Sequence, residues 1–284
     1  MDINVYKVIS EKMPSMSKSQ LKVAQYILKN PNQIPFLNVG KLAREADVSD
    51  ATVVRFATYL GFSGYPEFQQ HIQSSVQQQL TTTERLKMSQ EVYGEKDEEI
   101  TDILKGDVDN IQMTMKNLNI KSFRQAVECL LKARQVYIVA NRSAAALGTF
   151  MHYYLNMILD NVEILDSIEK DSDRLYELNK DDLVVGISYS RYTKSTVEIF
   201  SYAKEKGAMT VALTDNLLSP LIPHADVSLT AASQMPSFID SFVAPMSVIN
   251  ALIIYTAKAK QEGFEDRFDA LEKVWERFDV FYCT

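Results

Sequence analysis

The second half of the chain contains five short apolar runs, and this pattern limits its fold more than any other feature. Helical stretches separate most of the runs, which are rich in β-branched residues. They are 135–140 (QVYIVA), 162–165 (VEIL), 183–187 (LVVGI), 210–213 (TVAL) and 227–229 (VSL). Strands that are buried on both faces of a sheet have continuous apolar sequences, and strands that alternate with helices form parallel sheets. The pattern predicts a C-terminal α/β three-layer sandwich with a parallel sheet.

A different pattern occupies residues 37–65, LNVGKLAREADVSDATVVRFATYLGFSGY. Apolar residues recur there at helical spacing on both sides of a short turn. They are Val39, Leu42, Ala43 and Ala46 before the turn and Val48, Val53, Phe56 and Leu60 after it. Asp47 suits a left-handed turn position, and Ser49 is expected to cap the second helix. The pattern favours a helix-turn-helix in an all-α N-terminal domain, and the alternative is a plain pair of helices in a helical core.

The second of these helices is expected to read DNA. Once its apolar positions are assigned to the core, a set of polar and small residues remains on the outward face. Small residues near the start of a helix, followed by an arginine one turn later, suit entry into the major groove. The residues expected to contact DNA are Lys41, Ser49, Asp50, Ala51, Thr52, Arg55 and Thr58.

Charge is distributed unevenly along the 284 residues. The first 80 residues hold eight Lys or Arg and six Asp or Glu, whereas the remainder holds 22 and 31. A mildly basic head on an acidic body fits a small DNA-binding domain attached to a domain that binds something else. We therefore expect a helix-turn-helix domain at 1–80, a polar linker at 81–98, and a sensing and dimerisation domain at 99–284.

Several kinds of site are not indicated. The two cysteines, Cys129 and Cys283, suggest neither a disulfide framework nor a zinc site, and the three histidines lack metal-ligand spacing. No nucleotide-binding glycine motif is present, so no metal and no cofactor are predicted. The N-terminus lacks a signal-peptide pattern, and no uncharged run spans a bilayer comfortably. A cytoplasmic protein that does not contact membranes is expected.

Two hydroxyl-rich segments follow the first and third apolar runs. They are Asn141-Arg142-Ser143 and the segment 188–195, SYSRYTKS. Parallel α/β sheets bind ligands at the carboxyl ends of their strands. Hydroxyls and backbone N–H groups at a helix start, with Arg142 and Arg191 nearby, suit a phosphate. Ordinary helix capping is the alternative for either loop alone, but two such loops at one sheet edge favour a ligand site.

Three segments resemble a known family. They are 42–68, with the pattern LAxxAxVSxATVVRFxxxLGFxGYxEF, 187–208 (ISYSRYTKSTVEIFSYAKEKGA) and 212–229 (ALTDNLLSPLIPHADVSL). The first resembles the head of RpiR-type bacterial transcriptional regulators, and the others resemble their sugar isomerase (SIS) domain. The resemblance implies a regulator of sugar-metabolism genes that is controlled by a phosphosugar bound to the SIS domain.

The resemblance also assigns effector residues, with departures from the family pattern. The first SIS loop usually reads G-x-G-x-S. Residues 139–143 keep only the serine, Ser143. The second loop usually reads S-x-S-G-x-T, and here Arg191 replaces the glycine. The residues expected to bind the effector are Arg142, Ser143, Ser188, Ser190, Arg191 and Thr193. Glycine allows a phosphate to approach the backbone closely. Without the glycines, the alternatives are that Arg142 and Arg191 substitute their own charge or that the site binds a different anion.

We expect a homodimer or homotetramer on a palindromic operator. An almost wholly apolar helix at 242–257 predicts a subunit interface. An amphipathic tail at 265–284 is expected to dock on its own domain or on a partner subunit. The alternative function is a phosphosugar isomerase with a helical appendage. Isomerisation needs a positioned general base, and the nearest candidates, Glu198 and His152, lie outside the two loops. No catalytic residue is therefore predicted. A sensor acting only through protein partners would leave the head unexplained.

Overall fold

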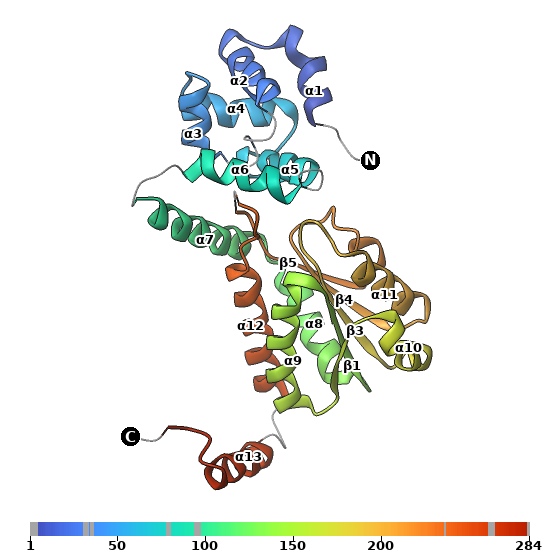
Figure 1. The fold of residues 1–284 in the computed structure, drawn as a ribbon. Coiled ribbons are helices and arrows are strands. Elements are labelled where there is room, and N and C mark those ends of the chain that lie inside the picture. The colour runs from blue at the N-terminus through green and yellow to red at the C-terminus, as the bar shows by residue number, and fades with distance from the viewer. Residues whose placement is uncertain are drawn as a thin grey trace. The chain divides into compact units, whose positions relative to one another are not determined.

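The chain forms two compact units (Figure 1). The computed structural model describes residues 5–30, 34, 37–77, 81–93, 98–235, 237–260 and 265–282. The first unit consists of Met1–Asp107 together with Gln234–Asp240. The second consists of Val108–Ser233 together with Ser241–Thr284. The short excursion Gln234–Asp240 thus belongs to the N-terminal unit although its flanking residues belong to the other.

The first unit is helical. Its helices are α1 (Val5–Lys12), α2 (Lys18–Lys29), α3 (Val39–Glu45), α4 (Asp50–Leu60), α5 (Tyr65–Gln77) and α6 (Thr82–Tyr93), with a 3-10 turn at Met13–Ser15. The Ser17 hydroxyl and the Gln20 side chain form a capping box that starts α2. Buried apolar residues of α2, α3, α4 and α5 make one core, in which the rings of Phe56 and Phe68 meet edge to face. The predicted all-α head is confirmed.

The second unit is built on a five-stranded parallel sheet with the order β2-β1-β3-β4-β5. Its strands are β1 (Val136–Ala140), β2 (Val162–Leu165), β3 (Leu183–Ile187), β4 (Met209–Thr214) and β5 (Val227–Thr230). All five predicted runs are strands, with ends within one residue of the prediction. The strands could be found from sequence because the inner ones are buried on both faces, which leaves an uninterrupted apolar signal.

Helices cover both faces of the sheet (Figure 1). One face packs against α8 (Ile120–Lys132), α9 (Ala145–Leu159) and α12 (Val243–Lys260), and the other against α10 (Ile168–Glu177) and α11 (Lys194–Glu205). Alternate residues of β1 serve the two faces: Ile138 joins the first core and Val139 the second. The predicted three-layer sandwich is confirmed. The chain also contains α7 (Glu98–Asn117) and α13 (Glu265–Arg277).

Helix α11 lies unusually close to β3. A Cβ atom placed on Gly186 would come within 2.5 Å of Cδ2 of Phe200, so only glycine fits at this point of the strand. Because Phe200 is fully buried against the strand, α11 is fixed on the sheet, and six residues, 188–193, connect the carboxyl end of β3 to its first turn. This packing positions the second hydroxyl loop.

The segment predicted as a linker contains regular structure. Residues Thr82–Tyr93 of the expected linker 81–98 form α6, and the division between the compact units falls after Asp107, inside α7. The polar composition of the segment concealed a helix. Within the described residues, no helix is both long and apolar enough to cross a membrane.

Candidate functional site

The helix-turn-helix is formed by α3 and α4. Asp47 adopts the left-handed conformation (φ 51°) predicted for the turn, and the amide of Val48 donates to the carbonyl of Ala43. Lys22 of α2 pairs with the Asp47 carboxylate at 2.5 Å and also donates to the Asp47 carbonyl. The hydrogen bond and charge of Lys22 lower the pKa of Asp47. The turn is therefore fastened to α2 while α4 projects from it.

Most of the residues expected to contact DNA are exposed. Ser49, Asp50, Ala51, Arg55 and Thr58 are exposed, and Lys41 is half-buried. The expectation that Thr52 faces outward is wrong, because only 8% of it is exposed. A β-branched residue in the first turn of α4 lies against the core beside Val53, which the helical period alone did not reveal.

Thr52 instead organises its neighbours. Its hydroxyl lies 3.0 Å from the hydroxyl of Ser49 and accepts a hydrogen bond from Nη2 of Arg55 at 3.4 Å. Ser49 occupies the N-cap position, as predicted, but its side chain makes no capping hydrogen bond to the backbone. The expected capping bond is therefore wrong: the Ser49 hydroxyl pairs with Thr52, and Thr52 in turn holds Arg55 along the exposed face of α4.

The two hydroxyl loops leave neighbouring strands at the same edge of the sheet. Ala140, the last residue of β1, is in register with Ile187, the last residue of β3. The first loop continues as a 3-10 turn at Arg142–Ala144, and the second runs from Ser188 to the N-cap residue of α11, Thr193. The expectation that the loops converge on one edge of a parallel sheet is confirmed.

Asn141 ties these loops together. Its side-chain amide donates to the carbonyl of Asp166, which follows β2, at 2.7 Å. Its side-chain oxygen accepts a hydrogen bond at 2.8 Å from Thr196, a fully buried residue of α11. One side chain therefore connects the segment that follows β1 with the segment that follows β2 and with α11. Asn141 stands where the family usually has a glycine, and its polar side chain was the signal that sequence reasoning did not use.

A second network supports the loop after β3. Thr214 at the end of β4 donates its hydroxyl to the carbonyl of Ser188 at 2.7 Å. The hydroxyl of Tyr192 donates to Asp215 at 2.7 Å, and Asn216 donates to Tyr192. Burial, and then the negative charge of Asp215, raise the pKa of Tyr192, so its hydroxyl remains a donor. These contacts hold the loop against β4.

The predicted effector residues differ in exposure. Ser188 and Ser190 are buried, Thr193 is half-buried, and Arg142, Ser143 and Arg191 are exposed. Arg142 (φ 57°) and Arg191 (φ 62°) both adopt the left-handed conformation. Arg191 therefore retains the backbone that the family glycine would provide at its position, while adding a guanidinium group.

Ordinary helix capping does not account for the loop hydroxyls. Thr193 is the N-cap residue of α11, but its side chain makes no capping hydrogen bond. The N-cap residue of α9 is Ala144, which has no side-chain oxygen, so Ser143 does not occupy that position. The capping alternative considered from sequence is therefore not realised at either position.

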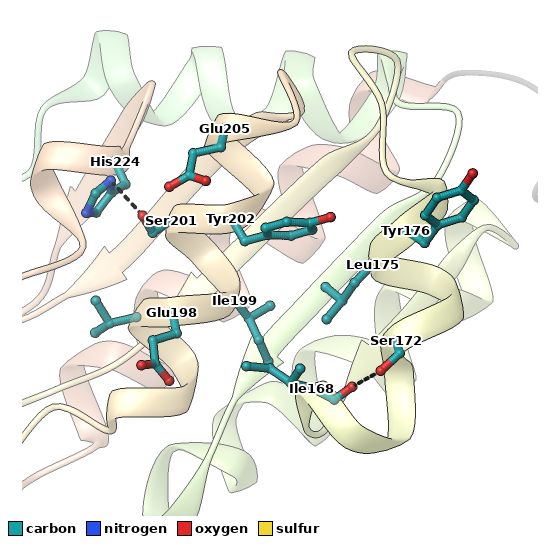
Figure 2. A pocket seen from close by; sticks show the side chains of 11 residues that line it. Ile168, Ser172, Leu175, Tyr176, Glu198, Ile199, Ser201, Tyr202, Glu205 and His224 are labelled. Carbon is teal, nitrogen blue, oxygen red and sulfur yellow. Dashed lines mark hydrogen bonds between the residues drawn. The ribbon is translucent and has the colours of Figure 1, made fainter.

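A separate cavity of about 610 Å³ lies between α10 and α11 (Figure 2). Apolar and tyrosine side chains, two glutamates and His224 line it: Ile168, Ser172, Leu175, Tyr176, Val197, Glu198, Ile199, Ser201, Tyr202, Glu205 and His224. Its lining does not include any of the six predicted effector residues. In the described part of the chain, no group of three or more His, Cys, Asp or Glu residues is placed to hold a metal ion.

Comparison with known proteins matches both units. Residues 3–79 match the helix-turn-helix domain of the rpiR family, and residues 129–255 match the SIS domain. An uncharacterised HTH-type transcriptional regulator from Caldanaerobacter subterraneus is 30% identical over 267 residues, which cover 90% of this chain and 92% of the relative. The chain belongs to the RpiR family of transcriptional regulators.

One further relative and two solved structures are similar to this RpiR-family regulator. HexR from Escherichia coli is 26% identical over 288 residues, covering 98% of this chain and 96% of HexR. The sugar isomerase domain of RpiR from Sphaerobacter thermophilus superposes with a TM-score of 0.60 at 26% identity, over 62% of this chain and 99% of that one. NanR from Vibrio vulnificus, solved with ManNAc-6P, superposes with a TM-score of 0.59 at 22% identity, over 99% and 100% of the two chains.

These findings decide against the isomerase alternative, since the relatives that span the whole regulator are named as transcriptional regulators. The two residues considered as bases also have other surroundings. His152 lies 3.2 Å from the carbonyl oxygen of Val162, and Glu198 pairs with Lys194 on α11. The RpiR-family protein is thus a transcriptional regulator and not an enzyme.

Proposed function

We propose that this RpiR-family regulator binds a palindromic operator as a homodimer or homotetramer in the cytoplasm, and that a phosphosugar on its SIS domain controls genes of sugar metabolism. The observation that carries the proposal is the convergence of two hydroxyl- and arginine-bearing loops at one edge of the sheet. In this proposal the helix-turn-helix binds the operator, and the sheet edge binds the phosphosugar.

The exposed face of α4 supports the DNA-binding half. Asp50 and Ala51 leave the first turn of the helix small enough to approach base edges, and Arg55 follows about one turn later. Thr52 limits the freedom of Arg55 by hydrogen bonding to its guanidinium group. In this proposal Arg55 reads a base or clamps a phosphate, and Lys41, Ser49 and Thr58 lie toward the DNA backbone.

Selection from a random DNA library, followed by anisotropy titration, tests this half. Arg55→Ala should weaken binding to the selected operator by about 1–3 kcal/mol. Arg124→Ala is the matched control, because it removes one exposed arginine from α8 in the other unit. Selected sites should be palindromic, with half-sites one or two helical turns apart. Unchanged affinity in Arg55→Ala would refute the assignment of α4.

The sheet edge supports the effector half. The start of α11 places backbone N–H groups and the positive end of a twelve-residue helix beside the second loop. Arg142 and Arg191 add positive charge from two neighbouring strands, and a guanidinium group binds a phosphate in bidentate fashion. Ser188 and Ser190 are buried in the second loop. This combination suits a phosphate attached to a polyol.

The fold neighbour NanR supports the ligand class, because that protein was solved with ManNAc-6P. A thermal-shift screen tests the class here, using glucose 6-phosphate, ribose 5-phosphate, ManNAc-6P and the unphosphorylated sugars. One phosphosugar should stabilise the protein in a concentration-dependent manner. The stabilisation should be lost in Ser190→Ala and retained in Ser172→Ala, which alters an exposed serine on α10. No response to any phosphosugar would refute the effector class.

Exposed apolar residues on α9 and α12 support an oligomer. Helix α12 buries one side in its own domain, whereas Ile254 and Tyr255 are more than half exposed. Tyr153 and Tyr154 are exposed on α9, which packs against α12. The sequence predicted that α12 is buried on all sides, but only one side of it is buried within the subunit. Ile254→Glu should lower the mass measured by analytical ultracentrifugation, and an unchanged mass would place the interface elsewhere.

A further inference from the structure

Arg85 is a charged residue buried in a polar helix. It lies in the first turn of α6 and is only 1% exposed, whereas Thr83, Glu84, Leu86 and Lys87 around it are exposed. The helix start is fixed, because the amide and hydroxyl of Thr81 both donate to the Glu84 carboxylate at 2.7 Å. Among the described side chains of α6, Arg85 is the one that is buried.

The guanidinium group of Arg85 binds three acceptors in one short segment. Its Nε donates to the carbonyl of Ser237 at 2.9 Å. Its Nη2 donates to the carbonyl of Ile239 at 3.1 Å and to the carboxylate of Asp240 at 2.6 Å. The side chains of Arg85 and Asp240 are 2% and 10% exposed, so solvent screens this ion pair little. We call this arrangement the Arg85 clamp.

A buried guanidinium group that loses its partners is strongly unfavourable. The segment Ser237–Asp240 and the first turn of α6 are therefore expected to move together. The geometry agrees with the division of the chain, because Gln234–Asp240 clusters with the N-terminal unit that contains α6. In sequence, only residues 78–81 separate α6 from α5 of the helical head.

The residues that lead into the clamped segment leave the sheet at the edge that carries the hydroxyl loops. They follow β5, whose last residue, Thr230, is in register with Thr214. The amide of Ala231 donates to the carbonyl of Thr214 at 2.8 Å, and the hydroxyl of Thr214 donates to the carbonyl of Ser188 at 2.7 Å. The amide of Ser241 donates to the carbonyl of Ser233, which closes the neck of the loop. Hydrogen bonds thus run from the second hydroxyl loop to the base of the clamped loop.

We propose that Arg85 is the positioning residue through which an effector at the hydroxyl loops changes the DNA affinity of the head. This inference rests on the proposed function. A ligand shifts a conformational equilibrium only by binding its states with different affinity. In our proposal, the loop after β5 has two positions, and the effector binds the protein more tightly in one of them. Because the Arg85 clamp holds this loop to α6, a change in the position of the loop also moves α6.

The test compares Arg85→Met with Lys87→Met, a matched change at an exposed position two residues further along α6. The ligand is whichever member of the phosphosugar series stabilises the wild type, and the DNA is the operator selected with the wild type. Saturating ligand should change wild-type and Lys87→Met operator affinity by about 5- to 150-fold. Arg85→Met should bind the ligand as the wild type does, but its operator affinity should change less than about twofold.

Asp240→Asn provides a second variant, because it removes the charge while preserving shape, and it should also weaken the response. Hydrogen exchange supplies an independent readout: ligand should alter the protection of Thr82–Tyr93 amides in the wild type and not in Asp240→Asn. A full ligand response in either folded variant would overturn the Arg85 clamp alone. A wild type that no phosphosugar stabilises would overturn the effector assignment, and the inference with it.

Discussion

The helix-turn-helix and the sheet edge both contain non-glycine residues in the left-handed conformation, and the two regions surround them differently. Asp47 closes the turn between α3 and α4, and its carboxylate is held by Lys22 of the same helical head. Arg142 and Arg191 lie on exposed loop positions at the carboxyl ends of β1 and β3. In the head the left-handed residue shapes a turn, whereas at the sheet edge the left-handed residues carry positively charged side chains. Strained residues of the second kind are typical of binding sites.

The largest expected effect is a loss of stability when the hydrogen bonds of Asn141 at the sheet edge are removed. Asn141→Ala removes two hydrogen bonds and leaves the buried hydroxyl of Thr196 without its partner. The free energy of unfolding should fall by about 1–3 kcal/mol. Chemical denaturation measures this loss. In a double-mutant cycle, Asn141→Ala with Thr196→Val should destabilise less than the sum of the single changes. If the two destabilising effects were simply additive, the hydrogen bond between Asn141 and Thr196 would contribute nothing to stability.

A smaller effect, on phosphosugar affinity, is expected from a change that removes the charge of Arg191 and keeps the backbone conformation of the loop. Arg191→Gly keeps a residue that tolerates positive φ, so the loop should retain its conformation while losing a guanidinium group. Phosphosugar affinity, measured by calorimetry, should fall by about tenfold, as expected for one charge-assisted hydrogen bond.

The matched change in the head is Asp47→Gly, which should leave operator affinity unchanged because the turn keeps its shape. Equal phosphosugar affinity in wild type and Arg191→Gly would mean that Arg191 supplies no charge to the site. The left-handed arginine would then resemble Asp47, and the contrast between the two regions would disappear.

The smallest effect is expected at the ion pair of Lys22 and Asp47, since both side chains are largely exposed. Lys22→Met should produce only a slight loss of thermal stability at neutral pH. The hydrogen bond from Lys22 lowers the folded-state pKa of Asp47, so its contribution is present above about pH 4. It is lost as the pH falls through the folded-state pKa. The melting temperatures of wild type and variant should therefore converge in acid. A difference that persists in acid would show that Lys22 stabilises the head through packing and not through the ion pair.

The strands and the helix-turn-helix were predictable because their signals are local and repeated. Short apolar or β-branched runs marked all five strands, and helical spacing identified Leu42, Val53 and Phe56 as core residues. The placement of the two loops at one edge followed from the parallel arrangement alone. These features depend on burial, which sequence periodicity reports directly.

The details of the sites depend on partners that are distant in sequence. Thr52 appeared to lie outward from its helical position, yet it is buried beside the core. The clamp between Arg85 and Asp240 joins residues 155 positions apart, and the polar sequence around Arg85 favoured a linker. Left-handed backbone at Arg142 and Arg191 was likewise not evident, because arginine has no local preference for it. Roles in binding DNA or effector remain predictions for all the named residues.

The most direct test of the account is the operator affinity of the wild type with and without a phosphosugar that is shown by thermal shift to bind. Anisotropy titrations should give affinities that differ by at least about fivefold, and Ser190→Ala should abolish the difference. Identical affinities, measured while the phosphosugar demonstrably occupies the protein, would contradict the claim that the sheet edge controls the helix-turn-helix.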